Sequence, residues 1–338
     1  MTDKIKGSIY GVVSAISYGL NPLGGLRLGE EGVNTHTILF SRFSLAIVLL
    51  AAFIIFKALK GKPSGIVDRI KQGFFLSRCV TLRTPRRSHS KASRLTHSAI
   101  ALIVILGVLF AASALSLYLS YLHMDSGIAS TLLFVYPIIV ALIMAIFFHE
   151  RITIVTVVSL AMALGGIALL NDGGSAQGIN ATGCMLVMIS SLSYALYIVL
   201  LNRWRVKIPV LTLNLYVMIV CASVIAAHAS VTPGEHLMPL PTPRAIGYAI
   251  MLAVVPTLIS LITMTKAIEL IGSTPTAIMG AFEPLTAVVV GIIVFHEAFT
   301  PHIAAGNMLI ILAVIMIISS RYITAALRGV AKKIIWHR

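Results

Sequence analysis

Two side chains that carry full charges lie deep inside long apolar stretches of the sequence. Arg42 stands in the stretch 37–56, and Glu283 stands in the stretch 274–295. A charge at the centre of a lipid bilayer costs roughly 3 kcal/mol or more, so such a side chain must face protein or water. Along a helix, Glu283 would lie about ten residues, or roughly 15 Å, into its stretch. We therefore expect Glu283 near the middle of a membrane, where it binds a solute ammonium group or carries a coupling proton.

Each of these charges also has a purely structural interpretation. Arg42 and Glu283 would form a permanent buried ion pair that braces the helices. Alternatively, Arg42 lies about one and a half turns from the end of its stretch, so its side chain would extend to the membrane surface as an anchor. Its functional interpretation is binding of a carboxylate. The sequence leaves these interpretations open.

Tyrosines and prolines recur in the same apolar stretches. The phenols either offer hydrogen bonds and aromatic faces to a solute or pack between helices. These tyrosines are Tyr18, Tyr136, Tyr194 and Tyr197. The prolines are candidate helix breaks, because proline lacks the N–H that a helix needs and frees a carbonyl in the preceding turn. They are Pro137, Pro256 and Pro284.

The composition points to a membrane protein. Of the 338 residues, 58% are hydrophobic and only 11% are charged, and the mean hydropathy is +0.98. A soluble domain carries about 25% charged residues, so a soluble enzyme, a disordered regulator and a secreted disulfide scaffold are not expected. Cys79, Cys184 and Cys221 form no CxxC pair, and the histidines form no HExxH motif. The sequence therefore predicts no metal site and no cofactor.

Ten stretches are long and apolar enough to cross the hydrocarbon core, which takes about 20 residues. They are 7–24, 37–56, 98–120, 126–148, 152–170, 179–201, 208–229, 245–266, 274–295 and 302–320. With a cytoplasmic N-terminus, 23 of the 26 lysines and arginines fall on the cytoplasmic side, as the positive-inside rule requires. We thus predict an all-α integral membrane protein of ten transmembrane helices, with both termini and a basic tail, 321–338, in the cytoplasm. Because the net charge of +15 is spread over loops, nucleic-acid binding is not expected.

The chain contains an internal repeat. Tyr136 corresponds to Glu283 at an offset of 147 residues, each directly before a proline, and Tyr18 corresponds to Tyr194 at an offset of 176. The sequence therefore predicts two repeats of five helices. Since five is odd, the second repeat lies upside down relative to the first. Inverted repeats with a binding site at their interface are typical of secondary transporters.

The predicted repeats cover 7–170 and 179–320. Their two offsets differ by 29 residues, which locates an insertion in the first repeat, within the basic cytoplasmic stretch 66–97. This stretch has poor apolar periodicity, so we expect a disordered or surface loop. It either contacts anionic lipid headgroups electrostatically or is a tolerated insertion without function.

The segments that close each half resemble a known family. In both 136–153 and 283–300, a proline is followed by Phe-His-Glu, whose glutamate stands thirteen residues after the proline, and then by a threonine. This pattern is similar to the end of an EamA repeat, and Arg42-Phe43 resembles the Arg-Phe of the family's second helix. The chain thus resembles the ten-helix members of the drug/metabolite transporter superfamily over nearly all of 7–320, apart from the insertion.

The resemblance implies a secondary transporter that moves a small metabolite by alternating access. We expect it to export an amino acid or a related solute across the cell membrane, which is the inner membrane in a Gram-negative bacterium, with proton coupling left open. The alternatives are a drug or toxin exporter or a metabolite importer of the same fold. From other classes, an ion channel or an intramembrane enzyme would fit, although no catalytic pair or P-loop is present and an enzyme is not expected. The expected partners are a small-molecule substrate and membrane lipids, and the chain is a monomer or a homodimer.

Overall fold

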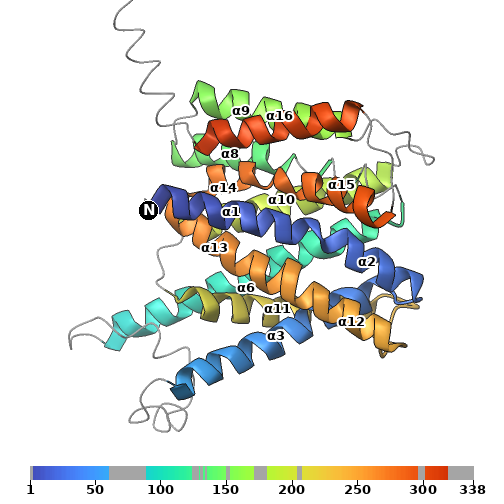
Figure 1. Ribbon diagram of the computed structural model, residues 1–338. Coiled ribbons are helices and arrows are strands. Elements are labelled where there is room, and N and C mark those ends of the chain that lie inside the picture. The colour runs from blue at the N-terminus through green and yellow to red at the C-terminus, as the bar shows by residue number, and fades with distance from the viewer. Residues whose placement is uncertain are drawn as a thin grey trace, which may run out of the picture.

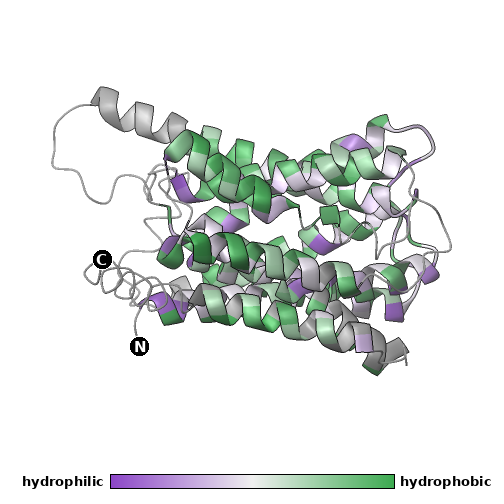
Figure 2. Cartoon of the chain, turned by 90° about the horizontal axis from the view of Figure 1, so that it is seen from above, coloured by the Kyte–Doolittle hydropathy of each residue, from purple (hydrophilic) through white to green (hydrophobic). Residues whose placement is uncertain are grey.

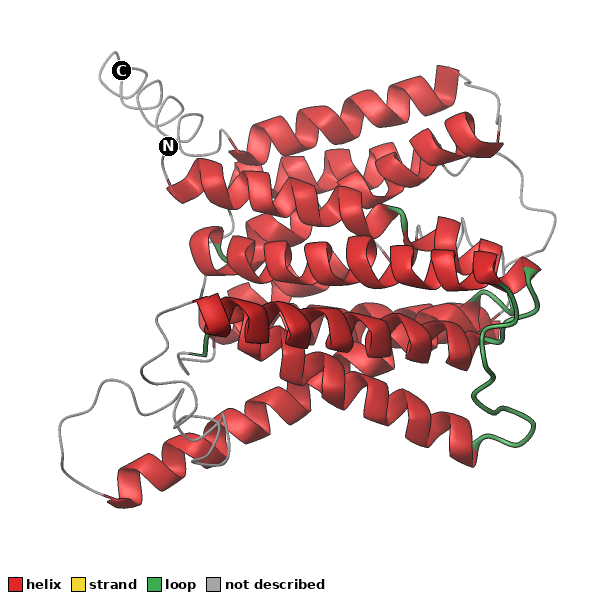
Figure 3. Ribbon diagram, turned by 60° about the horizontal axis from the view of Figure 1, so that its bottom comes forward, coloured by secondary structure: helices red, strands yellow, loops and turns green. Residues whose placement is uncertain are grey.

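The computed structural model describes residues 3–60, 89–123, 129, 132–133, 135–149, 153–170, 181–203, 208–295 and 301–318. Within these ranges the chain forms helices and no strands (Figure 3). In chain order the helices are α1 (Asp3–Gly19), α2 (Asn21–Glu30), α3 (Thr35–Lys60), α6 (His89–Ser120), α8 (Tyr136–Phe148), α9 (Ile154–Leu170), α10 (Ala181–Arg203), α11 (Val210–Val231), α12 (Pro243–Leu252), the π-helix η1 (Ala253–Ile259), α13 (Ser260–Ile271), α14 (Ser273–Met279), α15 (Phe282–Phe295) and α16 (Pro301–Ile318) (Figure 1).

Five helical stretches of the described chain are long and apolar enough to cross a membrane. They are Thr35–Phe56, Ala99–Ser120, Ala181–Arg203, Val210–Val231 and Pro243–Ile271. Hydrophobic residues dominate along the helices, and hydrophilic ones gather mostly toward the helix ends (Figure 2). Large apolar side chains also point outwards, such as Phe147 at 72% exposure and Val48 at 63%. This is the surface of a multi-pass membrane protein.

Each of the other five predicted stretches overlaps at least one described helix, but two of them are not single helices. The first, 7–24, is divided between α1 and α2, with a turn at Leu20. The stretch 274–295 is divided between α14 and α15 by a turn at Gly280 and Ala281. The expectation of one continuous helix was therefore wrong for 7–24, whereas the interruption in 274–295 lies just before Pro284, a candidate helix break. The number of crossings remains a prediction.

The prolines act in two different ways. Pro137 and Pro284 lie in the first turns of α8 and α15. Backbone N–H groups in a first turn have no partner within the helix, so a proline is tolerated there. Each of these two prolines therefore follows an interruption of the helical chain. Pro256 does not break its helix. It lies inside η1, and the chain runs from α12 through η1 into α13 without a gap. The wider π-turn accommodates the proline, so the predicted break at this position was wrong.

The insertion also differs from its expectation. Helix α6 begins at His89, so residues 89–97 of the predicted 66–97 loop are helical. Residues 66–88 lie outside the described part of the chain, as do the basic tail 321–338 and most of the first ten residues of the stretch 126–148.

Contacts between helices follow the repeat. Helix α1 of the first half packs against α13 and α15 of the second half. The repeat makes α10 the equivalent of α1, and it makes α6 and α8 the equivalents of α13 and α15. Helix α10 packs against α6 and α8, so the contact is repeated with the halves exchanged. The remaining equivalents pair with each other, α3 with α11 and α9 with α16. Figure 1 shows α9 and α16 side by side at one edge of the bundle. Each half thus contributes its helices to a core shared with the other half.

The approach of α1 to α15 is close enough to require glycine. A Cβ atom on Gly19 would lie 2.5 Å from the carbonyl oxygen of Glu283 and 2.7 Å from Cβ of Thr286. Gly247, in α12, is also a helical glycine, but nothing lies within 4 Å of the corresponding Cβ position.

We predict that Gly19→Ala lowers the free energy of unfolding by about 1–3 kcal/mol, because the backbone of α15 cannot move aside cheaply. Gly247→Ala, the matched control, should leave it unchanged or raise it by up to about 1 kcal/mol through helix propensity. Thermal unfolding of the purified protein in detergent measures both. Equal melting temperatures for the two variants would contradict this packing.

Candidate functional site

Arg42, in α3, is buried at 1% exposure and its guanidinium is held by neutral oxygens. Its Nε donates to Oγ1 of Thr257, its Nη1 donates to Oδ1 of Asn21 at 2.7 Å, and its Nη2 donates to the carbonyl of Pro256 at 3.2 Å. Within the described chain it forms no ion pair with Glu283. The structure thus shows neither the surface anchor nor the permanent strut that the sequence left open.

The irregular helix η1 supplies two of these acceptors. Pro256 stands four residues after Leu252 and has no N–H to give to the Leu252 carbonyl. The hydroxyl of Thr257 donates to that carbonyl at 2.8 Å. Because this hydroxyl donates its proton to the Leu252 carbonyl, its oxygen accepts the hydrogen bond from Arg42. The local sequence Pro-Thr therefore orients two oxygens towards one guanidinium.

Asn21 provides the third acceptor, at the start of α2. Its Oδ1 also accepts a hydrogen bond of 3.1 Å from the hydroxyl of Tyr118, in α6. Two aromatic rings flank the guanidinium, with Cζ of Arg42 5.6 Å from the centroid of Tyr18 and 5.2 Å from that of Phe43. Cation–π attraction adds to the hydrogen bonds that hold the charge.

The four predicted tyrosines come together around Tyr194. Its ring is stacked with that of Tyr18 at 6.5 Å and with that of Tyr197 at 6.3 Å, and it meets Tyr136 edge-on at 4.9 Å. They lie on α1, α8 and α10, so both repeats contribute. The hydroxyl of Tyr136 donates to the Ala277 carbonyl at 3.2 Å and that of Tyr194 donates to Met264 Sδ at 3.1 Å, while the phenol of Tyr18 meets the Arg42 guanidinium.

Glu283 lies beside this cluster, in the first turn of α15. The residue is buried at 9% exposure, and its side chain has neither a hydrogen bond nor an ion pair with the described chain. Its carboxyl group lies close enough to the phenols of Tyr18, Tyr136 and Tyr194 to interact with them electrostatically. Three side chains of the described chain have a fully enclosed oxygen without a hydrogen-bond partner, and they are Ser8, Ser159 and Thr274. Glu283 is not among them, so its carboxyl oxygens are not fully enclosed.

The repeat explains this gathering. Tyr18 and Tyr194 occupy equivalent positions and stack on each other, and Tyr136 is the equivalent of Glu283. Tyr18 neighbours both charges, since it lies under Arg42 and within the field of Glu283. The arrangement therefore offers one positive group, one negative group and an aromatic wall. No group of three or more side chains suited to a metal occurs within the described ranges.

Sequence reasoning missed three residues of this site, namely Asn21, Thr257 and Tyr118. The available signal was weak but present. Asn21 is a polar residue next to a proline at the end of an apolar stretch, and Thr257 directly follows Pro256. Tyr118 carries no such signal, because a tyrosine near a helix end more often packs than binds. It also lines a cleft of about 590 Å³ between α2, α3 and α6.

A bundle of apolar helices that encloses charged and aromatic groups defines a polytopic membrane protein with an internal polar site. The sequence pattern of the EamA-like transporter family matches residues 5–172 and 181–319. The chain belongs to the EamA-like transporter family, as its resemblance implied.

Similarity to individual proteins is more limited. An uncharacterized transporter of Archaeoglobus fulgidus is 36% identical over 81 residues, 24% of this chain and 28% of the relative. The uncharacterized inner membrane transporter YedA of Escherichia coli K12 is 27% identical over 175 residues, 50% of this chain and 54% of YedA. The matches thus span about half of YedA and about a quarter of the archaeal protein. One crystal structure shares the fold, with a TM-score of 0.68 and a sequence identity of 14%. The match covers 92% of this chain and 95% of the chain in that crystal structure.

Removal of the Asn21 acceptor tests the Arg42 network. We predict that Asn21→Leu lowers the free energy of unfolding by about 2–3 kcal/mol, because a guanidinium N–H and a phenol lose their partner together. Tyr118→Phe should cost only about 1 kcal/mol, since Arg42 keeps its bond to Asn21. Unfolding of the two single variants and the double variant in detergent measures the coupling. Strictly additive losses would contradict a shared acceptor.

Proposed function

We propose that the chain is a secondary transporter that moves a small solute across the cell membrane by alternating access. Two five-helix halves, with ten crossings in total and inverted relative to each other, would rock around one central site. Three observations support this proposal: the family, the description of both relatives as transporters, and the exchange of helix contacts between equivalent positions. Inverted halves give two gates of similar construction.

The observation that carries the proposal is a pair of unlike buried charges that do not neutralise each other. Within the described chain Arg42 donates to three neutral oxygens and also meets the phenols of Tyr18 and Tyr118, so no carboxylate there neutralises its charge. Glu283 has no partner there. An α-amino acid carries one carboxylate and one ammonium group, which complement Arg42 and Glu283 respectively. We therefore propose export of an amino acid or a related solute, with Tyr18 and Tyr194 forming the wall.

A lipophilic organic cation is the second candidate solute. The aromatic faces gathered at Tyr194, next to the carboxylate of Glu283, favour such a cation. Arg42 would then only stabilise the protein. The two candidates differ in one respect, because only the amino acid needs the guanidinium for binding.

The remaining elements of the proposal extend the sequence analysis. Both termini lie in the cytoplasm, the membrane is the inner membrane in a Gram-negative cell, and Glu283 exchanges a coupling proton with the solute. Binding of anionic lipids by the basic segment 66–97, and the choice between monomer and homodimer, remain proposals of the same kind.

Glu283→Gln tests the site because it keeps the shape of the side chain and removes its charge. A hydrogen bond to a charged group contributes about 1.5–3 kcal/mol, so solute affinity should fall about tenfold to hundredfold. Mass spectrometry of the medium compares solutes released by cells that express wild type, Glu283→Gln or no protein. Glu269→Gln, on the exposed part of α13, is the matched control and should export normally.

The outcomes separate the two solutes. A released amino acid whose export is lost in Glu283→Gln and in Arg42→Lys supports the zwitterion site. Export of an added organic cation that survives Arg42→Lys supports the second candidate. Normal export by Glu283→Gln at every pH would remove Glu283 from both the binding and the proton role.

A further inference from the structure

A pair of buried serines joins α1 to α13. The hydroxyl of Ser14, in α1, donates to the carbonyl of Ser260, the first residue of α13, at 3.0 Å. Its oxygen also lies 3.2 Å from the hydroxyl oxygen of Ser260. Because the one proton of the Ser14 hydroxyl goes to the carbonyl, the Ser260 hydroxyl is the donor of this second bond. We call this contact of two hydrogen bonds a serine clasp.

The same clasp joins α10 to α6. The Ser190 hydroxyl donates to the carbonyl of Ser113 at 2.8 Å, and the two hydroxyl oxygens are 3.1 Å apart. Both of these serines are buried as well. Ser190 is the equivalent of Ser14 at the offset of 176, and Ser260 is the equivalent of Ser113 at the offset of 147. Each clasp therefore joins one half to the other, and the two clasps are the same contact with the halves exchanged.

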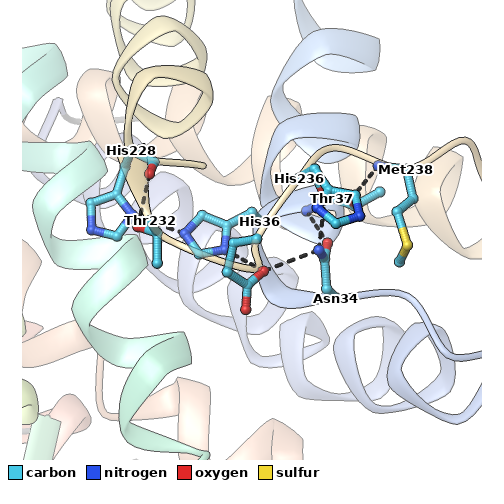
Figure 4. A network of polar contacts seen from close by, with 8 residues as sticks. Asn34, His36, Thr37, His228, Thr232, His236 and Met238 are labelled. Atoms are coloured by element: carbon cyan, nitrogen blue, oxygen red, sulfur yellow. Dashed lines mark hydrogen bonds and ion pairs between the residues drawn. The ribbon is translucent and has the colours of Figure 1, made fainter. Parts of the chain in front are cut away.

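The polar network at the end of the bundle where α2 leads into α3 has no such counterpart. It also joins the halves, since Nδ2 of Asn34 donates to Oε2 of Glu235 at 3.0 Å and Nε2 of His36 lies 2.9 Å from Nδ1 of His228 (Figure 4). At the offset of 176, however, His36 corresponds to Thr212, which has no imidazole. The opposite end of the bundle cannot repeat this network.

Inverted halves relate the two states of a rocking transporter. When each half takes up the conformation of the other, the bundle opens to the opposite face. In that second state, Ser14 and Ser260 adopt the geometry that Ser190 and Ser113 have now, and the reverse holds for Ser190 and Ser113. Because the two geometries are already alike, neither clasp has to break. Contacts that differ between equivalent positions are the ones free to change.

We propose that the two serine clasps are the fixed points about which the halves rock when the site changes the face to which it opens. This inference rests on the alternating access proposed above. Two fixed points define a line, so the movement is a rotation of one half relative to the other about the line that joins the clasps. The halves keep their contact at both clasps throughout.

The clasps lie at a depth that suits such a rotation. Ser113, Ser190 and Ser260 stand about two turns or more from either end of their membrane spans. A rotation about a line inside the membrane widens one end of the bundle while it narrows the other. Fixed points near either surface would instead leave that end of the bundle unable to open.

The clasps also adjoin the candidate site. Ser14 stands one turn before Tyr18 in α1, and Ser190 stands one turn before Tyr194 in α10, so each serine shares a helix face with one ring of the stacked pair. Side chains close to the line of rotation move least. The aromatic wall therefore stays in place while the two ends of the bundle move.

Disulfides between the halves test the fixed points. In the full chain, with its three native cysteines replaced by alanine, each clasp is converted to a cysteine pair and oxidised with copper phenanthroline. The hydroxyl oxygens of the clasps are 3.2 Å and 3.1 Å apart, so two sulfurs need only a small shift to bond at about 2.05 Å. The pairs are Ser14→Cys with Ser260→Cys and Ser113→Cys with Ser190→Cys, alone and together.

The matched control joins the same two halves at one end of the bundle. It is Asn34→Cys with Glu235→Cys, whose side chains touch in the network of Figure 4. Each oxidised variant is compared with its own form reduced by dithiothreitol. The reduced protein shows that the substitutions leave the chain folded and able to move.

Spin labels on exposed residues report the movement without any transport assay. One pair, Leu122 and Arg244, lies at the end that carries the network, and the other pair, Ile55 and Glu269, lies at the opposite end. In each pair the two residues belong to different halves. They are replaced by p-acetylphenylalanine and labelled at its ketone, which leaves the cysteines free. Electron–electron double resonance in nanodiscs measures the distances at about pH 5 and about pH 8, which drives the proton exchange proposed for Glu283 in both directions.

We expect two distance populations at each end in the parent protein, and both should remain when either clasp or both clasps are oxidised. The control disulfide should leave one population. Loss of a population on oxidation of a clasp, with recovery on reduction, overturns the fixed points but leaves the proposed function intact. A single population at both ends of the parent contradicts alternating access itself. Failure of both clasp pairs to form a disulfide, or two populations in the oxidised control, also overturns the proposal.

Discussion

A guanidinium inside a membrane core must be surrounded by acceptors, and this requirement organises the centre of the molecule. Regular helices cannot supply such acceptors, because their carbonyls are already bonded within the helix. The acceptors of Arg42 come instead from two irregular places, the break between α1 and α2, which presents Asn21, and the π-helix η1, which presents Pro256 and Thr257. Buried charge and helix irregularity therefore depend on each other here.

The duplication explains why one centre exists and why it is not symmetric. Equivalent tyrosines, Tyr18 and Tyr194, stack across the junction of the halves. At the next pair of equivalent positions the two halves differ, with Tyr136 in one and Glu283 in the other. The fold therefore keeps two-fold packing, while a single residue difference places a negative charge on one side only. The charges of the candidate site are therefore arranged without the symmetry that the helix packing retains.

Much of the fold could be predicted from the sequence, because apolar length, basic loops and repeat offsets are local or periodic signals. The same kind of signal led to the family and to Glu283 and Arg42 as candidate site residues. The break inside 7–24 was missed, since hydropathy does not register a turn between apolar helices. The role of Pro256 was mistaken because a π-turn accommodates proline. The partners of Arg42, one of them 215 residues away in the chain, depend on packing that no spacing pattern reveals.

The π-helix η1 has a consequence for the evolution of the chain. Each residue of an α-helix turns the backbone by about 100°, and a π-turn holds one residue more than an α-turn. Loss of a single residue within η1 would restore a regular helix and rotate all of α13 by that angle about its own axis. Ser260 would then turn away from Ser14, whose hydroxyl donates to its carbonyl at 3.0 Å. The seven-residue length of η1 thus sets which face of α13 points towards α1. In evolution, insertions and deletions within η1 should therefore be far rarer than substitutions.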